Sequence, residues 1–198
     1  MIIGIDEVGY GPIAGPLVAV ALTGIEYLPQ TIKQQLDDSK NLTPQKRQTL
    51  YDNLKQDNNI LFSYAMAEID DIEQHNILRA SHLAMVAAVE KLLPKMDKRH
   101  HCLLLDGNKL PKEWQGKNFA RSIIKGDGLY TSIAAASIMA KVYRDHLMQN
   151  YHQQYPDYGF AKHKGYGTAH HLAQIRAIGP CAIHRPSFLT KILRRKTA

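Results

Sequence analysis

The sequence has only two cysteines, Cys102 and Cys181, and neither belongs to a C-x-x-C pair. Zinc sites and disulfide frameworks use more cysteines at closer spacing, so this scarcity argues against both. We therefore expect two buried free thiols, no zinc, and a protein of the reducing cytoplasm.

Long apolar runs are missing as well. A membrane-spanning helix needs ~20 apolar residues, and the run LVAVALTGI is too short for this role. The first residues have the pattern of a strand rather than of a signal peptide. No repeat, low-complexity tract or linker interrupts the 198 residues, so we expect a single domain over 1–198 without a membrane partner.

Acidic residues are outnumbered by basic ones. The chain has 18 Asp and Glu against 25 Lys and Arg, which gives a net charge of +7. A basic balance is compatible with binding to nucleic acid, with binding to an anionic membrane, or with solubility alone. Composition by itself leaves these three possibilities open.

Strands and helices are predicted to alternate along the chain. Apolar segments predict strands over 1–6, 17–24, 60–69, 102–107 and 120–127. Helical patterns cover 44–56, 75–93, 132–155 and 168–178, and a loose basic tail follows them. The segment 17–24 is apolar throughout, as expected for a strand covered on both faces. The sequence therefore predicts an α/β domain of about five strands with helices packed on the sheet.

Four acids lie where apolar segments meet glycine. They are Asp6, Glu7, Asp106 and Asp127. If the strands that carry them are neighbours, the acids meet at one edge of the sheet. Successive side chains of a regular strand point to opposite faces. We therefore expect the first strand to end at the acidic pair, with Gly9 and Gly11 providing the break.

Carboxylates brought this close repel one another unless a cation lies between them. Two Mg²⁺ or Mn²⁺ ions would relieve the repulsion, because hard cations prefer oxygen ligands. In two-metal sites, one ion activates a water molecule and the other stabilises the leaving oxygen. The alternative is a set of unrelated surface acids at strand ends. That explanation is common for one acid and weaker for four.

Seven sequence blocks resemble, in order and spacing, the type 2 ribonuclease H family, ribonuclease HII. The blocks are GIDEVGYGPIAGPLVAVAL, DDSKNLTPQKR, HNILRASHLAM, LLLDGN, IKGDG followed by SIAAASIMAKVYRDHLM, YGFAKHKGYGT and HRPSF. They extend from residue 1 to about residue 189. The resemblance implies a ribonuclease H-like fold, with a mixed sheet of about five strands flanked by helices. It also implies a C-terminal helical segment and basic tail over about 156–198.

The resemblance assigns the acids a shared role. The family uses four carboxylates to hold two divalent ions, and the catalytic, metal-binding positions here would be Asp6, Glu7, Asp106 and Asp127. The implied cofactors are Mg²⁺ or Mn²⁺. Asp145 is set aside, because it lies within a helix beside Arg144 and a surface salt bridge is its expected state.

The resemblance also assigns substrate contacts. A glycine–arginine–glycine turn in the family approaches the ribose 2′-OH, which distinguishes RNA from DNA. The corresponding residues here are Gly9, Tyr10 and Gly11, so the glycines are kept but the charge of the arginine is lost. This departure bears on affinity and junction preference more than on cleavage.

Tyr166 matches a family tyrosine that packs against the sugar following the ribonucleotide, which favours an RNA-to-DNA step. Its alternative role is a loop aromatic held by glycines. Lys40 resembles a lysine near the phosphate backbone, and by sequence alone it would be a solvated loop cation. Further cations that would extend a basic track are Lys162, Lys164, Arg185 and residues 194–196. The histidine pairs at 100–101 and 170–171 are expected to be solvated and have no assigned role.

Together these features imply an endonuclease that hydrolyses the RNA strand of RNA/DNA hybrids and cuts 5′ of ribonucleotides embedded in duplex DNA. Two-metal-ion catalysis would leave 3′-hydroxyl and 5′-phosphate ends. The expected partner is nucleic acid, and the expected state is a monomer. Two alternatives stay open. One is a nucleic-acid-binding homologue with impaired catalysis, which Tyr10 permits. The other is a ribonuclease H-like nuclease acting on DNA junctions, which the glycine turn and Tyr166 disfavour.

Overall fold

The computed structural model describes residues 1–37, 39–97 and 101–194. Its strands are β1 (Ile2–Val8), β2 (Leu17–Thr23), β3 (Leu61–Ala67), β4 (Cys102–Asp106) and β5 (Ala120–Ile123). They form one sheet in the order β3-β2-β1-β4-β5. The pairs β1–β2 and β2–β3 are antiparallel, whereas β1–β4 and β4–β5 are parallel. The predicted mixed sheet of five strands is confirmed.

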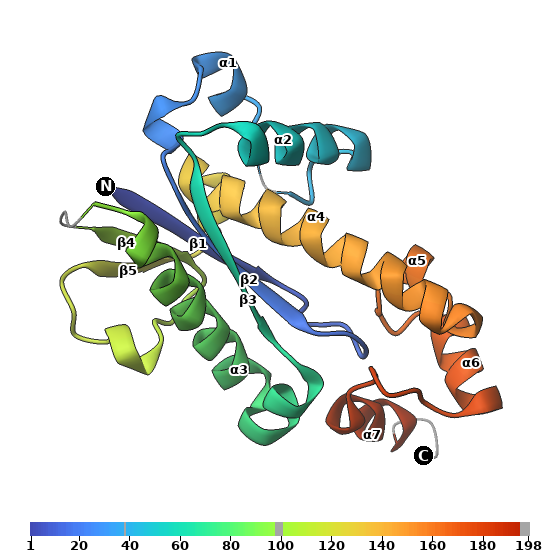
Figure 1. Ribbon diagram of the computed structural model, residues 1–198. Helices are drawn as coiled ribbons and strands as arrows, with labels where there is room; N and C mark the ends of the chain where they lie inside the picture. The colour runs from blue at the N-terminus through green and yellow to red at the C-terminus, as the bar shows by residue number, and fades with distance from the viewer. Residues whose placement is uncertain (38, 98–100, 195–198) are drawn as a thin grey trace.

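Helices cover both faces of this sheet (Figure 1). They are α1 (Gln30–Lys33), α2 (Pro44–Gln56), α3 (Ile69–Leu92), α4 (Thr131–Gln154), α5 (Phe160–His163), α6 (Ala169–Ile178) and α7 (Pro186–Arg194). All seven residues of β2 are buried. Leu17, Ala19 and Ala21 belong to the core beneath α3, while Val20 and Leu22 belong to the core beneath α2 and α4. This alternation confirms that the strand is covered on both faces.

Helix α3 begins earlier than its apolar pattern predicts. A capping box between Glu68 and Asp71 starts it at Ile69 rather than at residue 75. The helix is kinked at Asn76, which has φ 61° and ψ 161°. The Asn76 Oδ1 atom accepts hydrogen bonds from the backbone N–H groups of Leu78 and Arg79, at 3.1 and 3.2 Å. Asn76 therefore acts as an internal N-cap, and the predicted start marks the second half of the helix.

The start of α4 lies directly on β1. A Cβ atom at Gly4 would collide with the backbone carbonyl of Ser132, so glycine is needed there. Alanines 134–136 are buried in the same contact layer. This close approach places the polar residues of α4 beside the second half of β1.

The C-terminal helices form a third core beside the end of α4 (Figure 1). Phe160, Ile175 and Leu189 contribute to it, together with Met148 of α4. The tail after residue 179 was expected to be loose, and this is wrong for α7 because Leu189 anchors it in the core. Residues 195 and 196 of the expected basic track lie outside the described residues. No helix in the described part of the chain is long and apolar enough to cross a membrane.

Candidate active site

Three of the predicted acids converge at one edge of the sheet. The parallel register of β1 and β4 ends at the pair Ile5–Leu105, so the next residues, Asp6 and Asp106, emerge side by side. Asp127 comes from a 3-10 turn, Gly126–Gly128, that leads into α4. One carboxylate oxygen from each acid lies within 4.8 Å of the others.

Glu7 joins this cleft in a way that the sequence did not predict. The first strand was expected to end at the acidic pair, but β1 continues to Val8 and Glu7 pairs with Ala19 of β2. The ladder with β4 has already ended, so β1 has an uncovered edge beside Glu7. Glu7 is partly exposed and lines the same cleft as the buried Asp6.

The cleft has a volume of about 390 Å³. All five predicted substrate-binding residues line it: Gly9, Tyr10, Gly11, Lys40 and Tyr166. Three further polar residues, which sequence reasoning missed, are Ser39, Ser137 and Lys141. Ser137 and Lys141 lie one turn apart in the apolar stretch from Ile133 to Val142 and are its two polar members. Two polar residues at i and i+4 in an otherwise apolar stretch lie on the same side of a helix, and this pattern could have indicated that they face the cleft.

Backbone amides orient the acids. The Glu7 N–H donates to Asp6 Oδ1 at 2.8 Å, and the Gly126 N–H donates to Asp106 Oδ1 at 2.7 Å. The Lys40 Nζ atom lies 3.5 Å from Asp127 Oδ2. These contacts hold the carboxylates in place, with one oxygen of each of the three aspartates near the other two.

The crowding alters the protonation of the acids. Burial raises the pKa of Asp6 well above its usual value, and the charges of Glu7 and Asp106 raise it further. Burial, followed by the charge of Asp106, raises the pKa of Glu7 to about 7. Carboxylates with such mutual repulsion and oxygen-only donors fit hard divalent cations.

The glycine turn borders the cleft. Gly9 has φ 103°, and a Cβ atom there would lie 2.6 Å from the Arg144 Nε atom, so glycine is required. Gly11 has ordinary backbone angles, and a Cβ atom would lie 3.6 Å from Cε1 of Tyr166. The ring of Tyr166 therefore lies next to Gly11, and both Tyr10 and Tyr166 are exposed.

The expected basic track is wrong at Arg185. This side chain is fully buried, and its guanidinium donates to the carbonyls of Pro12 at 2.8 Å and Gly15 at 2.7 Å. A buried guanidinium bonded to carbonyls is not available to phosphates. Lys164 is partly buried and donates to the Ala161 carbonyl at 2.7 Å, while the Lys40 side chain is 78% exposed.

Asp145 forms the expected helix-surface ion pair, but with Lys141 at 2.7 Å rather than with Arg144. Arg144 is fully buried and donates to the carbonyls of Ala14, Pro16 and Lys164. It holds the turn after β1 against α4.

Two smaller expectations need correction. His170 is exposed, as predicted, but His171 is fully buried. His100 lies outside the described residues. Cys102 and Cys181 are free thiols, yet each is only partly buried.

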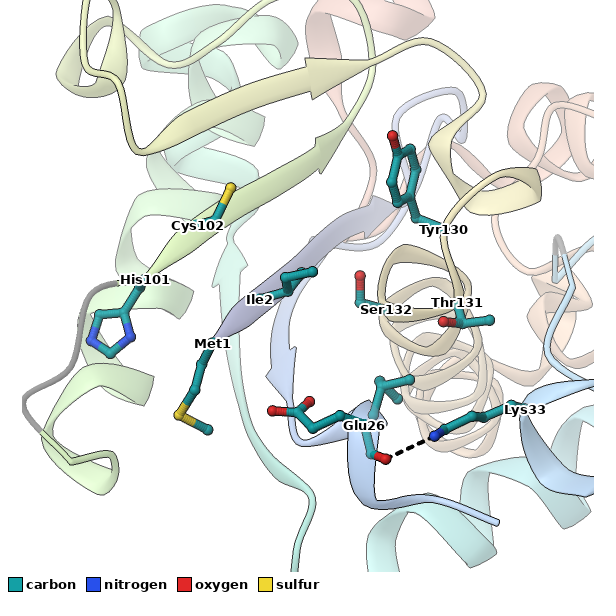
Figure 2. Close-up of a pocket in the computed structure, with 10 residues that line it drawn as sticks. Met1, Ile2, Glu26, Lys33, His101, Cys102, Tyr130, Thr131 and Ser132 are labelled. Carbon is teal, nitrogen blue, oxygen red and sulfur yellow. Dashed lines mark hydrogen bonds between the residues drawn. The ribbon is translucent and has the colours of Figure 1, made fainter. Parts of the chain in front are cut away.

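A larger cavity, of about 630 Å³, lies at the opposite end of β1. Figure 2 shows Met1, Ile2 and Cys102 on one side of it, and Lys33 donating to the Glu26 carbonyl at 2.8 Å. Ile2 precedes Asp6 by four strand residues, a separation of ~13 Å. The acids that converge are therefore not part of this cavity, and size alone does not identify the site.

Known proteins of one family are similar to this chain over most of its length. The family model described as Ribonuclease HII matches residues 3–191. A Ribonuclease HII of Chlamydia abortus is 48% identical over 189 residues, covering 95% of this chain and 84% of the relative.

Two solved structures have the same fold. Ribonuclease H2 from Pyrococcus horikoshii matches with a TM-score of 0.76 and 24% identity, covering 98% of this chain and 97% of that one. Bst-RNase HIII in complex with Mn²⁺ matches with a TM-score of 0.74 and 16% identity, covering 98% and 70%. The predicted ribonuclease H-like fold is confirmed.

Proposed function

The chain belongs to the ribonuclease HII family of endonucleases, and from that premise we propose that it hydrolyses the RNA strand of RNA/DNA hybrids and cuts duplex DNA 5′ of embedded ribonucleotides. Cleavage would leave 3′-hydroxyl and 5′-phosphate ends. The observation that carries the proposal is the convergence of the Asp6, Asp106 and Asp127 carboxylates within 4.8 Å of one another, in a chain with net charge +7.

The four acids Asp6, Glu7, Asp106 and Asp127 would hold two divalent ions, Mg²⁺ or Mn²⁺. When bound, such ions lower the pKa of an attacking water and stabilise the charge on the leaving oxygen. The oxygen-only donor set and the raised pKa values of Asp6 and Glu7 support this assignment.

The chain's own contribution is to fix these groups before substrate arrives. The Gly126 amide orients the Asp106 carboxylate. The hydroxyl of Ser137, which bonds the Ser39 hydroxyl at 2.9 Å, favours the ionised form of Asp6 and so lowers the pKa of that carboxyl, partly offsetting the effect of burial. Groups held in this way need little rearrangement during the reaction, which is the usual source of electrostatic catalysis.

Substrate selection would come from the rim of the cleft. Gly9 is buried, but the backbone of Tyr10 and Gly11 is exposed at the cleft, where a ribose 2′-OH would approach it, and Tyr166 would pack against the following sugar. Tyr10 occupies the place of the family arginine but has no charge to offer a phosphate. Lys40 and Lys141 are the cations of the cleft lining that would face the phosphate backbone.

The test uses three duplexes in the presence of Mg²⁺ or Mn²⁺. They are a DNA duplex with one ribonucleotide, an RNA/DNA hybrid and an all-DNA control. We expect cleavage of both RNA-containing duplexes, with a 3′-hydroxyl on the upstream fragment. The proposal would be overturned if neither RNA-containing duplex were cut in the presence of Mg²⁺ or of Mn²⁺. Equal cutting of the all-DNA duplex would favour the junction-nuclease alternative.

Variants locate the reaction in this cleft. Asp106→Asn should abolish cleavage while leaving the circular dichroism spectrum unchanged. The matched control is Asp157→Asn, the same change at an exposed acid outside the cleft lining, which should retain full activity. Retained activity in Asp106→Asn would show that the metal site lies elsewhere.

A further inference from the structure

A second cluster of titratable side chains lies behind Tyr166, outside the acidic cleft. It consists of His163 from α5, His171 from α6 and His184 from the segment before α7. His171 and His184 are 0% and 3% exposed. The rings of His163 and His171 stack with centroids 4.2 Å apart. The metal-dependent function proposed above uses none of these side chains.

The hydrogen bonds of this cluster form a chain with one direction. The Cys181 N–H donates to His184 Nδ1 at 2.9 Å, so His184 has its proton on Nε2. That Nε2–H donates to His171 Nε2 at 3.0 Å. The His171 proton is then on Nδ1, which donates to the Tyr166 carbonyl at 2.9 Å. Both imidazoles are neutral in this arrangement.

The opposite tautomers do not satisfy the same groups. A proton on His184 Nδ1 would reach the Cys181 carbonyl at 3.2 Å, but it would oppose the Cys181 N–H. It would also leave His171 Nδ1 without a proton opposite the Tyr166 carbonyl, placing two acceptors together. The first arrangement alone pairs every donor with an acceptor.

The same chain segment is fixed from its other side. His163 donates from Nε2 to the Tyr158 carbonyl at 2.6 Å and accepts from the Gly165 amide at 3.2 Å. The Tyr166 N–H donates to the His163 carbonyl at 2.9 Å. Lys164 and Gly165 both have left-handed backbone angles, with φ 50° and 87°. The turn that presents Tyr166 therefore depends on hydrogen bonds from neutral histidines.

We propose that His171 and His184 are positioning residues for substrate selection, because they fix the carbonyl of Tyr166 and so hold its ring against Gly11 at the rim of the cleft. The proposal rests on the function above, in which Tyr166 packs against the sugar that follows the ribonucleotide. The pair contacts neither substrate nor metal and acts through Tyr166.

The surroundings keep the pair neutral. Burial lowers the pKa of His171 to about 4 and also lowers that of His184. The titratable groups around them are His163, His170, Tyr158 and Cys181. The charges of His163 and His170 add to the lowering at His171. At neutral pH, the acceptor that His184 needs on His171 is therefore present.

The test compares selectivity rather than activity alone. Kinetics are measured on the duplex with one ribonucleotide and on the RNA/DNA hybrid, and the ratio of the two kcat/KM values is the readout. His171→Leu should lower this ratio about tenfold, and much less when Tyr166→Ala is already present, because coupled residues are not additive. His170→Leu, the same change at the exposed neighbour, should leave the ratio unchanged.

Two further variants guard against misfolding. His171→Asn keeps an N–H donor in the place of Nδ1 and should restore most of the selectivity. His184→Asn keeps an acceptor for the Cys181 amide but removes the donor to His171, so its ratio should fall. Hydrogen exchange at the Thr168 amide, which donates to the Tyr166 carbonyl at 2.8 Å, should become faster in His171→Leu and His184→Asn.

The outcomes separate the two proposals. An unchanged ratio in His171→Leu and His184→Asn, or an equal fall with and without Tyr166→Ala, would assign the pair a merely structural role. If the wild-type protein cuts neither duplex, the proposed function is wrong. The exchange measurement then still reports whether the histidines fix Tyr166.

Discussion

The protein buries charge of both signs, and the two signs are treated in opposite ways. At the edge of the sheet, Asp6 lies buried among other acids that repel it. Arg144 and Arg185 are equally buried, but their guanidiniums donate to backbone carbonyls on several sides. A buried charge with such partners is part of the framework, whereas carboxylates crowded together are receptive to cations.

The two regions are connected through the turn that follows β1. Arg144 and Arg185 bind carbonyls between Tyr10 and Pro16, immediately after the acidic pair. Arg144 and Arg185 therefore fix the backbone next to the crowded acids. In this arrangement the framework charges stabilise the fold, and the crowded acids depend on it for their proximity.

The sharpest test of this difference is Asp6→Asn. If the acids exist to hold metal, the variant should lose activity by about 1000-fold or more, comparable to the loss of a main electrostatic group. Without metal, however, it should be more stable than the wild type by about 1 kcal/mol, because one repelling charge is removed. Cleavage assays and urea unfolding in EDTA measure the two effects. A metal-free variant less stable than the wild type would show that Asp6 supports the fold.

Arg185→Leu should have the opposite effect on stability. The change removes donors to the Pro12 and Gly15 carbonyls and leaves those acceptors buried. Each buried carbonyl left without a donor costs about 1–3 kcal/mol, so the loss of both partners should lower the free energy of unfolding by about 2–6 kcal/mol. Urea denaturation checks this value, and Arg176→Leu, at an exposed arginine of α6, is the matched control, expected within about 0.5 kcal/mol of wild type. A loss of less than about 0.5 kcal/mol in Arg185→Leu would show that this buried arginine does not stabilise the fold, and the difference from the crowded acids would disappear.

Metal addition should stabilise the folded protein through the crowded acids alone. At 100 times its Kd, Mg²⁺ or Mn²⁺ should raise the free energy of unfolding by about 2.7 kcal/mol in the wild type. At a fixed metal concentration, the stabilisation should be larger at about pH 8 than at about pH 6, because protons compete for the same carboxylates and weaken metal binding. In the metal-free protein the pKa of Glu7, about 7, is above its usual 4.5. Its contribution to stability is therefore complete below pH 4.5 and lost as the pH rises through 7. Thermal unfolding across this range, with Asp106→Asn as control, tests the sign.

Much of the crowded region was accessible from the sequence. The acids follow apolar strands, and the continuous apolar run of β2 indicated a strand covered on both faces. Local pattern is sufficient here because strand ends and helix caps depend on neighbouring residues. The position of Glu7 was not accessible, because the end of the β4 ladder rather than the end of β1 uncovers it.

The framework charges were not predictable in the same way. Arg185 was expected to meet phosphate, but its acceptor Gly15 lies 170 positions earlier in the chain. His171 was expected to be solvated, and its partner His184 comes from another segment. Whether a cation meets solvent, a ligand or a carbonyl depends on such distant contacts, which periodicity and composition do not report.

The smallest expected effect comes from returning charge to the rim of the cleft. Tyr10→Arg places a guanidinium beside exposed Tyr166, where the family arginine would contact a phosphate. Affinity for a ribonucleotide-containing duplex should rise by a few-fold to about tenfold, and the slope of log K against log salt should steepen by ~0.9. Tyr27→Arg makes the same change at an exposed tyrosine outside the cleft lining and controls for net charge. Equal salt slopes in the two variants would mean that long-range charge acts, whereas a steeper slope for Tyr10→Arg alone would place one phosphate at the turn held by Arg185.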